Sequence, residues 1–318
     1  MNLKTKIEVL EPKQVWERIQ KKSNAFQSGY YAFYSSWYGG IVKEPQYLLC
    51  PMDDHMVHRG DAVFEAMKTV GRKVFLMDAH LDRLFVSAEK IAIKPSLSKA
   101  EIKDMILQTL MVADRSETLI RLFLSRGPGG FTTNPYDSIG SQLYIIITEL
   151  KTLPGEKYLM GVKVNRSQIP AKETWMAQVK SCNYLPNVMM KKEAVDQKVD
   201  FTVAFDKDNF LAESSTENIV IVDQSGMILA PELRNILKGT TMSRALELAK
   251  AQGLPVAHRN ISESDLINAR EVMMIGTTLD VLPVTSYQGQ KIGSGIVGEI
   301  AKQLNSLVEE DFKNGVPF

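Results

Sequence analysis

The chain has 318 residues, of which 44% are hydrophobic and 24% charged, and its 38 basic and 37 acidic residues give a net charge of +1. This length allows one large or two medium domains with a sizeable core. The balanced charge argues against a nucleic acid or an acidic membrane as partner. No apolar run approaches the ~20 residues that span a bilayer. A charged N-terminal segment without an apolar stretch and only two cysteines predict a cytoplasmic protein with neither secretory signal nor disulfide framework.

The first half of the chain alternates helical and strand patterns. Apolar residues at helical spacing predict helices over 11–28 and 80–93. Ser98, with Glu101 three residues later, predicts the capped start of a helix that runs to Ala113. Short apolar runs predict strands at 47–50, 74–77, 119–125 and 143–149.

A candidate linker, KTLPGEKY at 151–158, precedes a second set of elements. Strands are predicted at 161–165, 201–205, 219–222, 227–229 and 271–275. Helices are predicted at 187–197, 241–252 and 296–312. The interleaved helices and strands predict an α+β fold with mixed or antiparallel sheets and two domains, 1–150 and 158–318.

Lys180 follows a stretch of mostly apolar residues, which predicts a lysine at the end of a buried strand. Burial disfavours the charged form of an amine. A neutral amine is a nucleophile that can condense with an aldehyde. The alternative is an ordinary solvated lysine at a chain turn.

Glu213, in FLAESSTENIVIV at 210–222, stands just before a β-branched strand. A carboxylate directed inward there can keep a pyridine nitrogen protonated, which makes the ring an electron sink. The alternative is a hairpin turn whose polar residues satisfy the backbone.

Two Gly-Thr-Thr turns and one arginine are candidates for binding a phosphate. The turns lie in LKGTTMSRALELA at 237–249 and MMIGTTLDVLPV at 273–284. Free N–H groups at a helix start suit a phosphate, although Thr241 or Ser243 could be only a helix cap. Arg83, in HLDRL, can bind phosphate through two parallel hydrogen bonds, or it can belong to a solvated ion-pairing face.

Together these groups match the needs of one cofactor, pyridoxal 5'-phosphate. It requires an amine for its aldehyde, a carboxylate for its ring nitrogen and cationic or N–H-rich groups for its phosphate. No comparable pattern predicts a metal site, because His55 and His58 lack further ligands at a convincing spacing.

The ordered motifs resemble those of the fold type IV (class IV) pyridoxal-phosphate enzymes. The motifs are HRGDAVFEAMKTVGRKVFLMDAHLDRLFVSA, KSCNYLPNVMMKKEA, LAESSTENIVIV, ILKGTTMSRALELA and IGTTLDVLPV. The family includes branched-chain aminotransferases, D-amino-acid aminotransferases and 4-amino-4-deoxychorismate lyases. The resemblance covers roughly residues 35–310 and is strongest to the D-amino-acid-aminotransferase-like and aminodeoxychorismate-lyase-like branch.

The resemblance implies a role for each matching residue. Lys180 would carry the cofactor and move the proton, and Glu213 would face the ring nitrogen. The phosphate would be bound by Arg83, Thr240, Thr241 and Thr277. The substrate would meet Thr278, Arg121, Arg126 and Phe64. An active site between two α/β domains, a homodimer, and amino-acid and 2-oxo-acid substrates are also implied.

The specificity loop matches no branch fully. RGPGGFTTNP lacks the Arg-x-His pair of typical D-amino-acid transaminases, and Phe131 stands where typical deoxychorismate lyases have an arginine. Leu185 replaces a tyrosine found in many branched-chain enzymes. The resemblance therefore predicts a transaminase, with a lyase that releases pyruvate and 4-aminobenzoate as the alternative. A catalytically idle domain that binds the cofactor or an anion is a third reading, disfavoured by intact Lys180 and Glu213.

Overall fold

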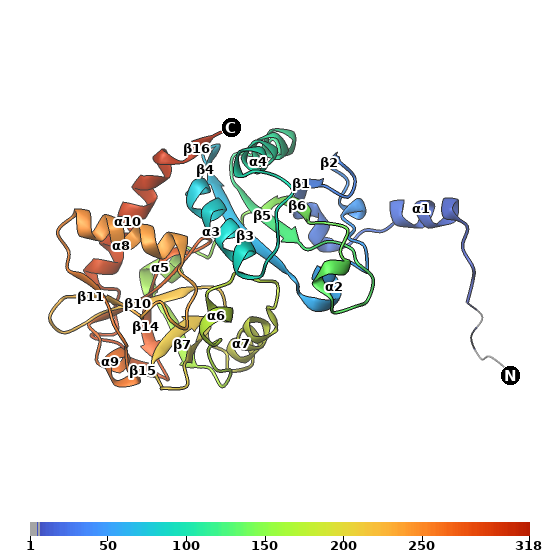
Figure 1. Cartoon of the computed structure of the whole chain (residues 1–318). Coiled ribbons are helices and arrows are strands. Elements are labelled where there is room, and N and C mark those ends of the chain that lie inside the picture. The colour runs from blue at the N-terminus through green and yellow to red at the C-terminus, as the bar shows by residue number, and fades with distance from the viewer. Residues whose placement is uncertain (1–4, 6) are drawn as a thin grey trace.

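The computed structural model describes residue 5 and residues 7–318, which form two lobes of helices packed on sheets (Figure 1). The N-terminal lobe contains an antiparallel sheet with the strand order β16-β4-β3-β5-β6-β1-β2. Its strands are β1 (Tyr30–Ser35), β2 (Gly40–Val42), β3 (Ala62–Val70), β4 (Lys73–Val74), β5 (Thr118–Ser125), β6 (Gln142–Glu149) and β16 (Val316–Pro317).

Helices α3 (Met77–Lys90) and α4 (Lys99–Ala113) pack against this sheet and form its core. In α3, Leu81, Leu84 and Ala88 recur at helical spacing and are fully buried. The predicted capping box of α4 is confirmed, because Ser98 and Glu101 bond each other's backbone N–H groups.

The C-terminal lobe contains a mixed sheet that closes on itself. Its order is β12-β11-β10-β13-β14-β7-β8-β9, and β9 also pairs with β10 through Glu213 and Asn218. The strands are β7 (Val162–Arg166), β8 (Phe201–Phe205), β9 (Leu211–Ser214), β10 (Asn218–Val222), β11 (Ile228–Ala230), β12 (Val256–His258), β13 (Glu271–Gly276), β14 (Asp280–Tyr287) and β15 (Gln290–Lys291), which pairs with β14.

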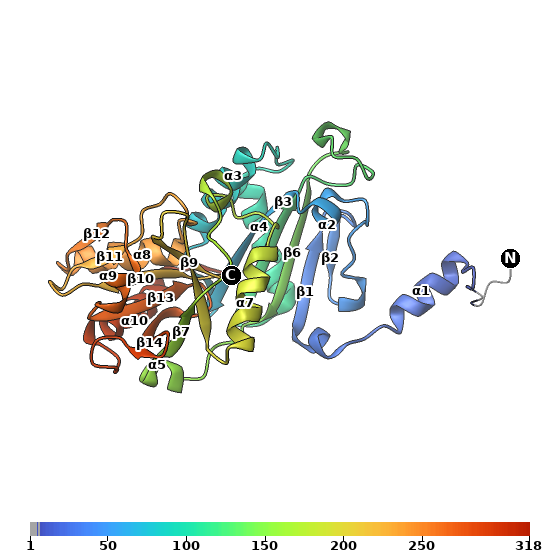
Figure 2. The same cartoon turned by 90° about the horizontal axis from the view of Figure 1, so that it is seen from below.

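Two buried clusters stabilise the C-terminal lobe. One is built mainly from the strands and includes Tyr287 and Val203, and the other lies against α8 (Thr240–Ala251) and α10 (Glu299–Asp311). The remaining helices are α1 (Pro12–Gln20), α2 (His55–Arg59), α5 (Glu156–Met160), α6 (Thr174–Ala177), α7 (Leu185–Asp196) and α9 (Glu263–Ile267), with 3-10 turns η1 (Ala25–Gly29), η2 (Pro45–Tyr47), η3 (Pro135–Asp137) and η4 (Phe312–Asn314). Helix α1 extends away from its lobe (Figures 1 and 2).

The predicted α+β class is confirmed, but several predicted elements are wrong. The strand predicted at 74–77 ends at Val74 and α3 begins at Met77, because Leu76 adopts a left-handed conformation (φ of +52°) that breaks the strand. The helix predicted over 11–28 divides into α1 and η1, because Asn24 caps a new turn by accepting from the N–H of Phe26. The strand predicted at 47–50 is the end of η2 and an irregular segment, since Pro45 starts a tight turn there. The apolar patterns also failed to reveal β1, β3 and β14.

The chain crosses from one lobe to the other between β6 and α5. We propose that the domain boundary lies here, as the linker at 151–158 suggests. The terminal strand β16 returns to pair with β4 of the N-terminal sheet, so the last residues belong to that lobe. Within residue 5 and residues 7–318, no helix is both long and apolar enough to cross a membrane.

Candidate active site

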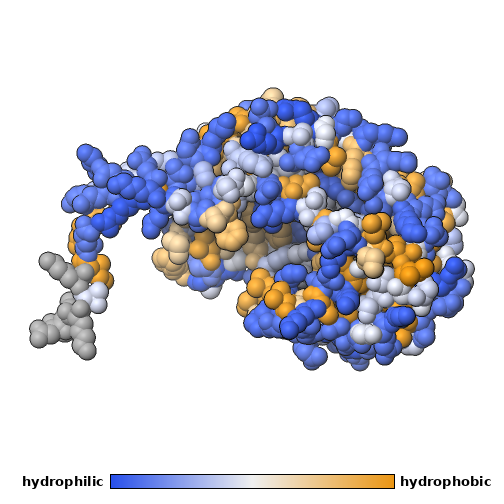
Figure 3. All heavy atoms as spheres, turned by 180° about the vertical axis from the view of Figure 1, so that it is seen from behind, coloured by the Kyte–Doolittle hydropathy of each residue, from blue (hydrophilic) through white to orange (hydrophobic). Residues whose placement is uncertain are grey.

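A cavity lies where the two lobes meet, and Figure 3 shows a recess between them. One part of its wall includes Arg83, Lys172, Lys180, Tyr184, Glu213, Thr240, Thr241 and Thr277. An adjoining part includes Phe64, Ala66, Arg121, Phe123, Cys182 and Thr278, and shares Lys180, Tyr184 and Thr277 with the first. The fold therefore brings together every site residue predicted from the sequence except Arg126.

Lys180 lies in an extended segment that pairs with β3. Its carbonyl accepts a hydrogen bond from Phe64 N at 2.9 Å, and Ser181 forms a bridge with Val63. The predicted buried strand before it is wrong: Trp175 belongs to the short helix α6 and is 63% exposed. Only the backbone around Lys180 is strand-like, because β3 supplies its hydrogen-bond partners.

The side chain of Lys180 is half-buried, and its amine faces aromatic rings. Nζ lies 4.7 Å from the centre of the Phe64 ring and 6.0 Å from that of Tyr184. Burial and the nearby charge of Arg83 lower the pKa of Lys180 to about 8. Among the described residues, the carboxylates near it act only at a distance, without a hydrogen bond. About a tenth of the amine is therefore neutral at pH 7.

Glu213 lies on β9, where its carboxylate accepts a hydrogen bond from Leu237 N at 3.1 Å. Burial raises the pKa of Glu213 to about 7, although Leu237 N and the more distant Lys172 and Lys180 act in the opposite direction. In the described chain no cation touches this carboxylate. A protonated ring nitrogen would supply the missing charge.

Arg83 is fixed by a buried carboxylate on β3. Its Nε and one terminal nitrogen each lie 2.7 Å from the oxygens of Glu65, which is fully buried. Glu65 also lies 2.7 Å from Nδ1 of His80, whose Nε2 lies 3.1 Å from Oγ1 of Thr240. The remaining terminal nitrogen of Arg83 donates to Lys238 O at 3.1 Å. Arg83 is thus oriented toward the start of α8, not solvated.

The two Gly-Thr-Thr turns border the cavity from the C-terminal lobe. Gly239 is the N-cap of α8, so the free N–H groups of the first helical turn begin at Thr240. A Cβ on Gly239 would collide with the side-chain oxygen of Asn218. The second turn, with Thr277 and Thr278, joins β13 to β14. Both turns present backbone groups that suit an anion.

The substrate side of the cavity is mainly aromatic. Phe64 stacks on Phe123 with ring centres 5.9 Å apart and meets Tyr184 edge-on at 5.0 Å. Arg121, on β5, is exposed and lines the same space, beside Thr278. This region combines an apolar wall with the guanidinium of Arg121 and the shared amine of Lys180.

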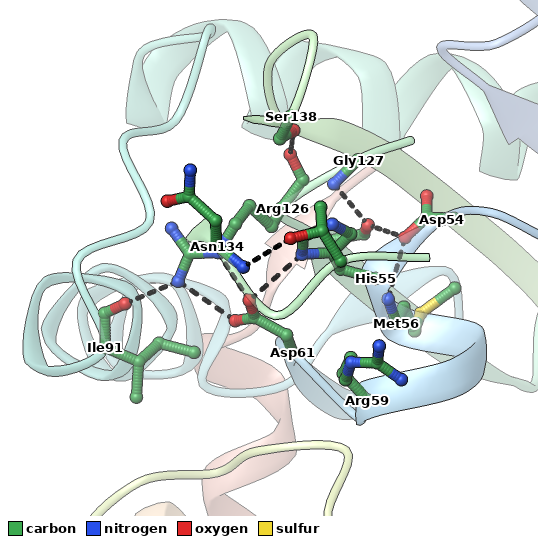
Figure 4. A network of polar contacts seen from close by, with 12 residues as sticks. Asp54, His55, Met56, Arg59, Asp61, Ile91, Arg126, Gly127, Asn134 and Ser138 are labelled. Carbon is green, nitrogen blue, oxygen red and sulfur yellow. Dashed lines mark hydrogen bonds and ion pairs between the residues drawn. The ribbon is translucent and has the colours of Figure 1, made fainter. Parts of the chain in front are cut away.

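Arg126 lies elsewhere and has other partners (Figure 4). Its guanidinium forms two hydrogen bonds with Asp61, at 2.5 and 3.0 Å, and donates to the carbonyl oxygens of Ile91 and Ala92 at the end of α3. His55 lies beside the same carboxylate, with Nδ1 3.7 Å from Asp61. The structure therefore places Arg126 in a network that anchors the loop 126–140, not in the cavity.

Sequence reasoning missed Glu65, Tyr184, Lys172 and His80. Glu65 and Phe64 are neighbours on β3, and the period of two along a strand directs them to opposite sides. Recognising β3 in AVFEAMKTV would have placed Glu65 on the side opposite the predicted Phe64. Lys172 gives no local signal, because the fold alone brings it to the cavity.

The residues present fit pyridoxal phosphate. An arginine and two N–H-rich turns suit its phosphate, Glu213 lacks a cation, and Lys180 offers a partly neutral amine. The fold and site thus define a pyridoxal-phosphate enzyme.

Comparison with known proteins supports the assignment to a pyridoxal-phosphate enzyme. Residues 62–287 match the family model "Amino-transferase class IV". The chain is 34% identical over 317 residues to a D-amino-acid transaminase, chloroplastic, of Arabidopsis thaliana, which covers 98% of this chain and 84% of the relative. It is 33% identical over 261 residues to a putative branched-chain-amino-acid aminotransferase of Methanocaldococcus jannaschii, covering 82% of this chain and 89% of that relative. The chain belongs to the class IV aminotransferase family, which uses pyridoxal phosphate.

Solved structures support the fold. The branched-chain aminotransferase of the archaeon Thermoproteus uzoniensis, solved with norvaline, superposes with a TM-score of 0.82 at 20% identity, covering 90% of this chain and 96% of that one. The 4-amino-4-deoxychorismate lyase of Pseudomonas aeruginosa superposes with a TM-score of 0.77 at 22% identity, covering 88% and 98%. Transaminases and a lyase therefore share this architecture.

Proposed function

We propose that this aminotransferase uses Lys180 to move a proton while the amino group passes from an amino acid to a 2-oxo acid. The observation that carries the assignment is the partly neutral Lys180 amine, which lies between the aromatic wall and the groups facing ring and phosphate. Bound pyridoxal phosphate supplies an aldehyde and an electron-withdrawing ring.

Each side chain has a defined task in this proposal. Arg83, the backbone N–H of Thr240, and the N–H and hydroxyl groups of Thr241 and Thr277 would bind the phosphate. Glu213 would pair with the ring nitrogen and keep it protonated.

The amine proposed to react with the substrate, that of Lys180, lies beside the aromatic wall of the cavity. Lys180 would take the α-proton from the substrate and deliver it to the aldehyde carbon of the cofactor, an acid–base step that contributes roughly 10²–10⁴-fold.

Arg121 and the backbone at Thr278 are the proposed receptors for the substrate carboxylate. Both line the part of the cavity that adjoins Lys180. Phe64 and Phe123 form the apolar wall that would exclude water and face the substrate side chain. This combination suits an amino acid with one carboxylate held by Arg121 and a side chain of limited polarity. Arg126, bound by Asp61, is proposed to anchor its loop instead.

A panel of donors and acceptors tests the function. L- and D-alanine, L- and D-glutamate, leucine and aminodeoxychorismate are mixed one by one with the holoenzyme, and the cofactor absorbance is followed. We expect an amino acid alone to change the absorbance once, and a 2-oxo acid to restore it. Pyruvate formed from aminodeoxychorismate without an acceptor would instead identify a lyase. Lys180→Ala should lose both the change and turnover.

We further propose a homodimer in the cytoplasm. Exposed apolar side chains in the turn before α2 and in loop 126–140, such as Met52, Phe131 and Tyr136, support a protein interface. Two cysteines without a disulfide suit a reducing compartment. Light scattering during gel filtration and cell fractionation test these two proposals, and a monomeric mass or an organellar location would contradict them.

A further inference from the structure

Strand β3 serves the site with both of its faces. Successive side chains of a strand point to opposite sides. Phe64 and Ala66 line the substrate part of the cavity, whereas Glu65 contacts Arg83 and His80 on the other side. Lys68 continues the face of Phe64 and Ala66, but its side chain leaves the N-terminal lobe.

Lys68 forms a buried ion pair with Asp280 of the C-terminal lobe. Its Nζ lies 2.6 and 2.5 Å from the two carboxylate oxygens, and the side chain of Lys68 is 5% exposed. The same amine lies 4.3 Å from the centre of the Phe312 ring. The pair therefore joins β3 directly to the first residue of β14.

Asp280 ends the turn that carries two of the proposed site residues. It pairs in register with Gly276 across the β13–β14 hairpin, so Thr277 and Thr278 lie between the paired positions. Its φ of +52° lies in the left-handed region, which Asp and Asn tolerate better than most residues. Fixing the Asp280 carboxylate consequently fixes the end of this turn.

Stability alone does not account for this pair. Removing two charges from water is costly, and well-packed apolar residues of similar volume often stabilise a fold as well or better. What an ion pair with two short contacts adds is a defined geometry. Here that geometry relates the Thr277–Thr278 turn to the strand that carries Phe64 and holds Lys180.

We propose that Lys68 and Asp280 are positioning residues, which set the Thr277–Thr278 turn at the correct distance from Lys180 and Arg83. This inference rests on the proposed phosphate-binding role of Thr277. Neither residue lines the part of the cavity assigned to cofactor or substrate. They act through the turn.

The test compares two ligands of the cofactor-free protein, pyridoxamine 5'-phosphate and pyridoxamine, by fluorescence titration. The ratio of the two affinities measures how much the phosphate contributes. Lys68→Met and Asp280→Asn should each lower this ratio roughly tenfold, since small displacements of binding groups are costly. Because Asn tolerates the left-handed conformation, Asp280→Asn isolates the charge. The double variant should lose no more than the worse single variant, because the pair acts as a unit.

Controls separate positioning from loss of folding and from failure of the site itself. A merely structural role would weaken both ligands equally and leave the ratio unchanged in Lys68→Met, which would overturn the inference. Lys73→Met removes a nearby lysine that bonds only Lys313 O at the same junction and should keep the wild-type ratio. Thr277→Val should lower the ratio. If Thr277→Val lowered the ratio while Lys68→Met and Asp280→Asn did not, the positioning role alone would be wrong. If the wild-type protein bound pyridoxamine 5'-phosphate and pyridoxamine equally well, the proposed phosphate site would be wrong as well.

Discussion

His80 and Thr240 connect the two lobes at the proposed phosphate site, with 3.1 Å between Nε2 and Oγ1. Burial lowers the pKa of His80, so its ring is neutral. Its Nδ1 faces the carboxylate of Glu65, which can only accept, and therefore carries the hydrogen. Nε2 must then accept from the Thr240 hydroxyl. The Thr240 hydroxyl is thereby occupied, whereas its backbone N–H remains at the start of α8.

This geometry predicts different effects for two adjacent threonines. Thr241→Val removes a hydroxyl that borders the cavity, so the affinity for pyridoxamine 5'-phosphate should fall roughly tenfold, the equivalent of one charge-assisted hydrogen bond. Thr240→Val should reduce this affinity less and lower the unfolding midpoint more, because it leaves the buried Nε2 of His80 without a hydrogen-bond donor. Titration and thermal unfolding of both variants check the prediction, which an identical loss of affinity would contradict.

The sequence predicted the residues proposed to carry out the chemistry better than the residues that hold the site in place. Lys180, Glu213 and Arg83 stand in sequence motifs that indicate their proposed roles. Glu65 and Lys68, which contact Arg83 and Asp280, have no such motif. They lie on β3, whose AVFEAMKTV pattern has no clear alternation because both faces of the strand are largely buried. The contacts of β3 with Lys180 and Asp280 join residues more than a hundred positions apart. Such pairings depend on how the lobes pack, which local patterns do not encode.

The Lys180 amine predicts a pH dependence for cofactor capture. Only the neutral amine attacks an aldehyde, and the pKa of Lys180 is lowered to about 8. Capture of pyridoxal phosphate by the cofactor-free protein should therefore be half-maximal near pH 8 and slow about tenfold per pH unit below it. Rapid-mixing absorbance measures this rate. Lys172→Met removes a nearby positive charge and should shift the midpoint upward; a wild-type midpoint near 10 would be inconsistent with a desolvated amine.

In the cofactor-free protein, the buried Glu213 carboxylate should lower the free energy of unfolding, although the proposed reaction requires it. Its folded-state pKa, raised to about 7 by burial, means that the folded chain loses stability as pH rises from about 4.5 through 7. Glu213→Gln removes this loss and should raise the unfolding midpoint at pH 8 by roughly 2–4 °C, while turnover falls. At pH 4 the midpoints should nearly coincide. A variant less stable than wild type at pH 8 would show that the carboxylate is compensated.

The buried Glu65 carboxylate should make the free energy of unfolding sensitive to acid. Burial alone would raise its pKa, but Arg83 and His80 outweigh burial and lower the pKa to about 2. Its contribution to the free energy of unfolding is therefore complete above pH 4.5 and is lost as pH falls toward 2. Glu65→Gln should cost about 3 kcal/mol at pH 7 and flatten this acid limb. Denaturant titrations at several pH values measure both, with Glu89→Gln on the exposed part of α3 as the control; an unchanged acid limb would assign the sensitivity to other groups.

The alternating contacts of β3 also limit how this enzyme can diverge. Inserting or deleting one residue ahead of Phe64 would send Glu65 and Lys68 to the opposite sides of the sheet, so the anchor of Arg83 and the contact with Asp280 would be lost in a single event. Substitutions can alter the cavity wall gradually, whereas length changes here cannot. New substrate preferences should therefore arise in loops, which tolerate changes of length, such as 126–140, while β3 keeps its register.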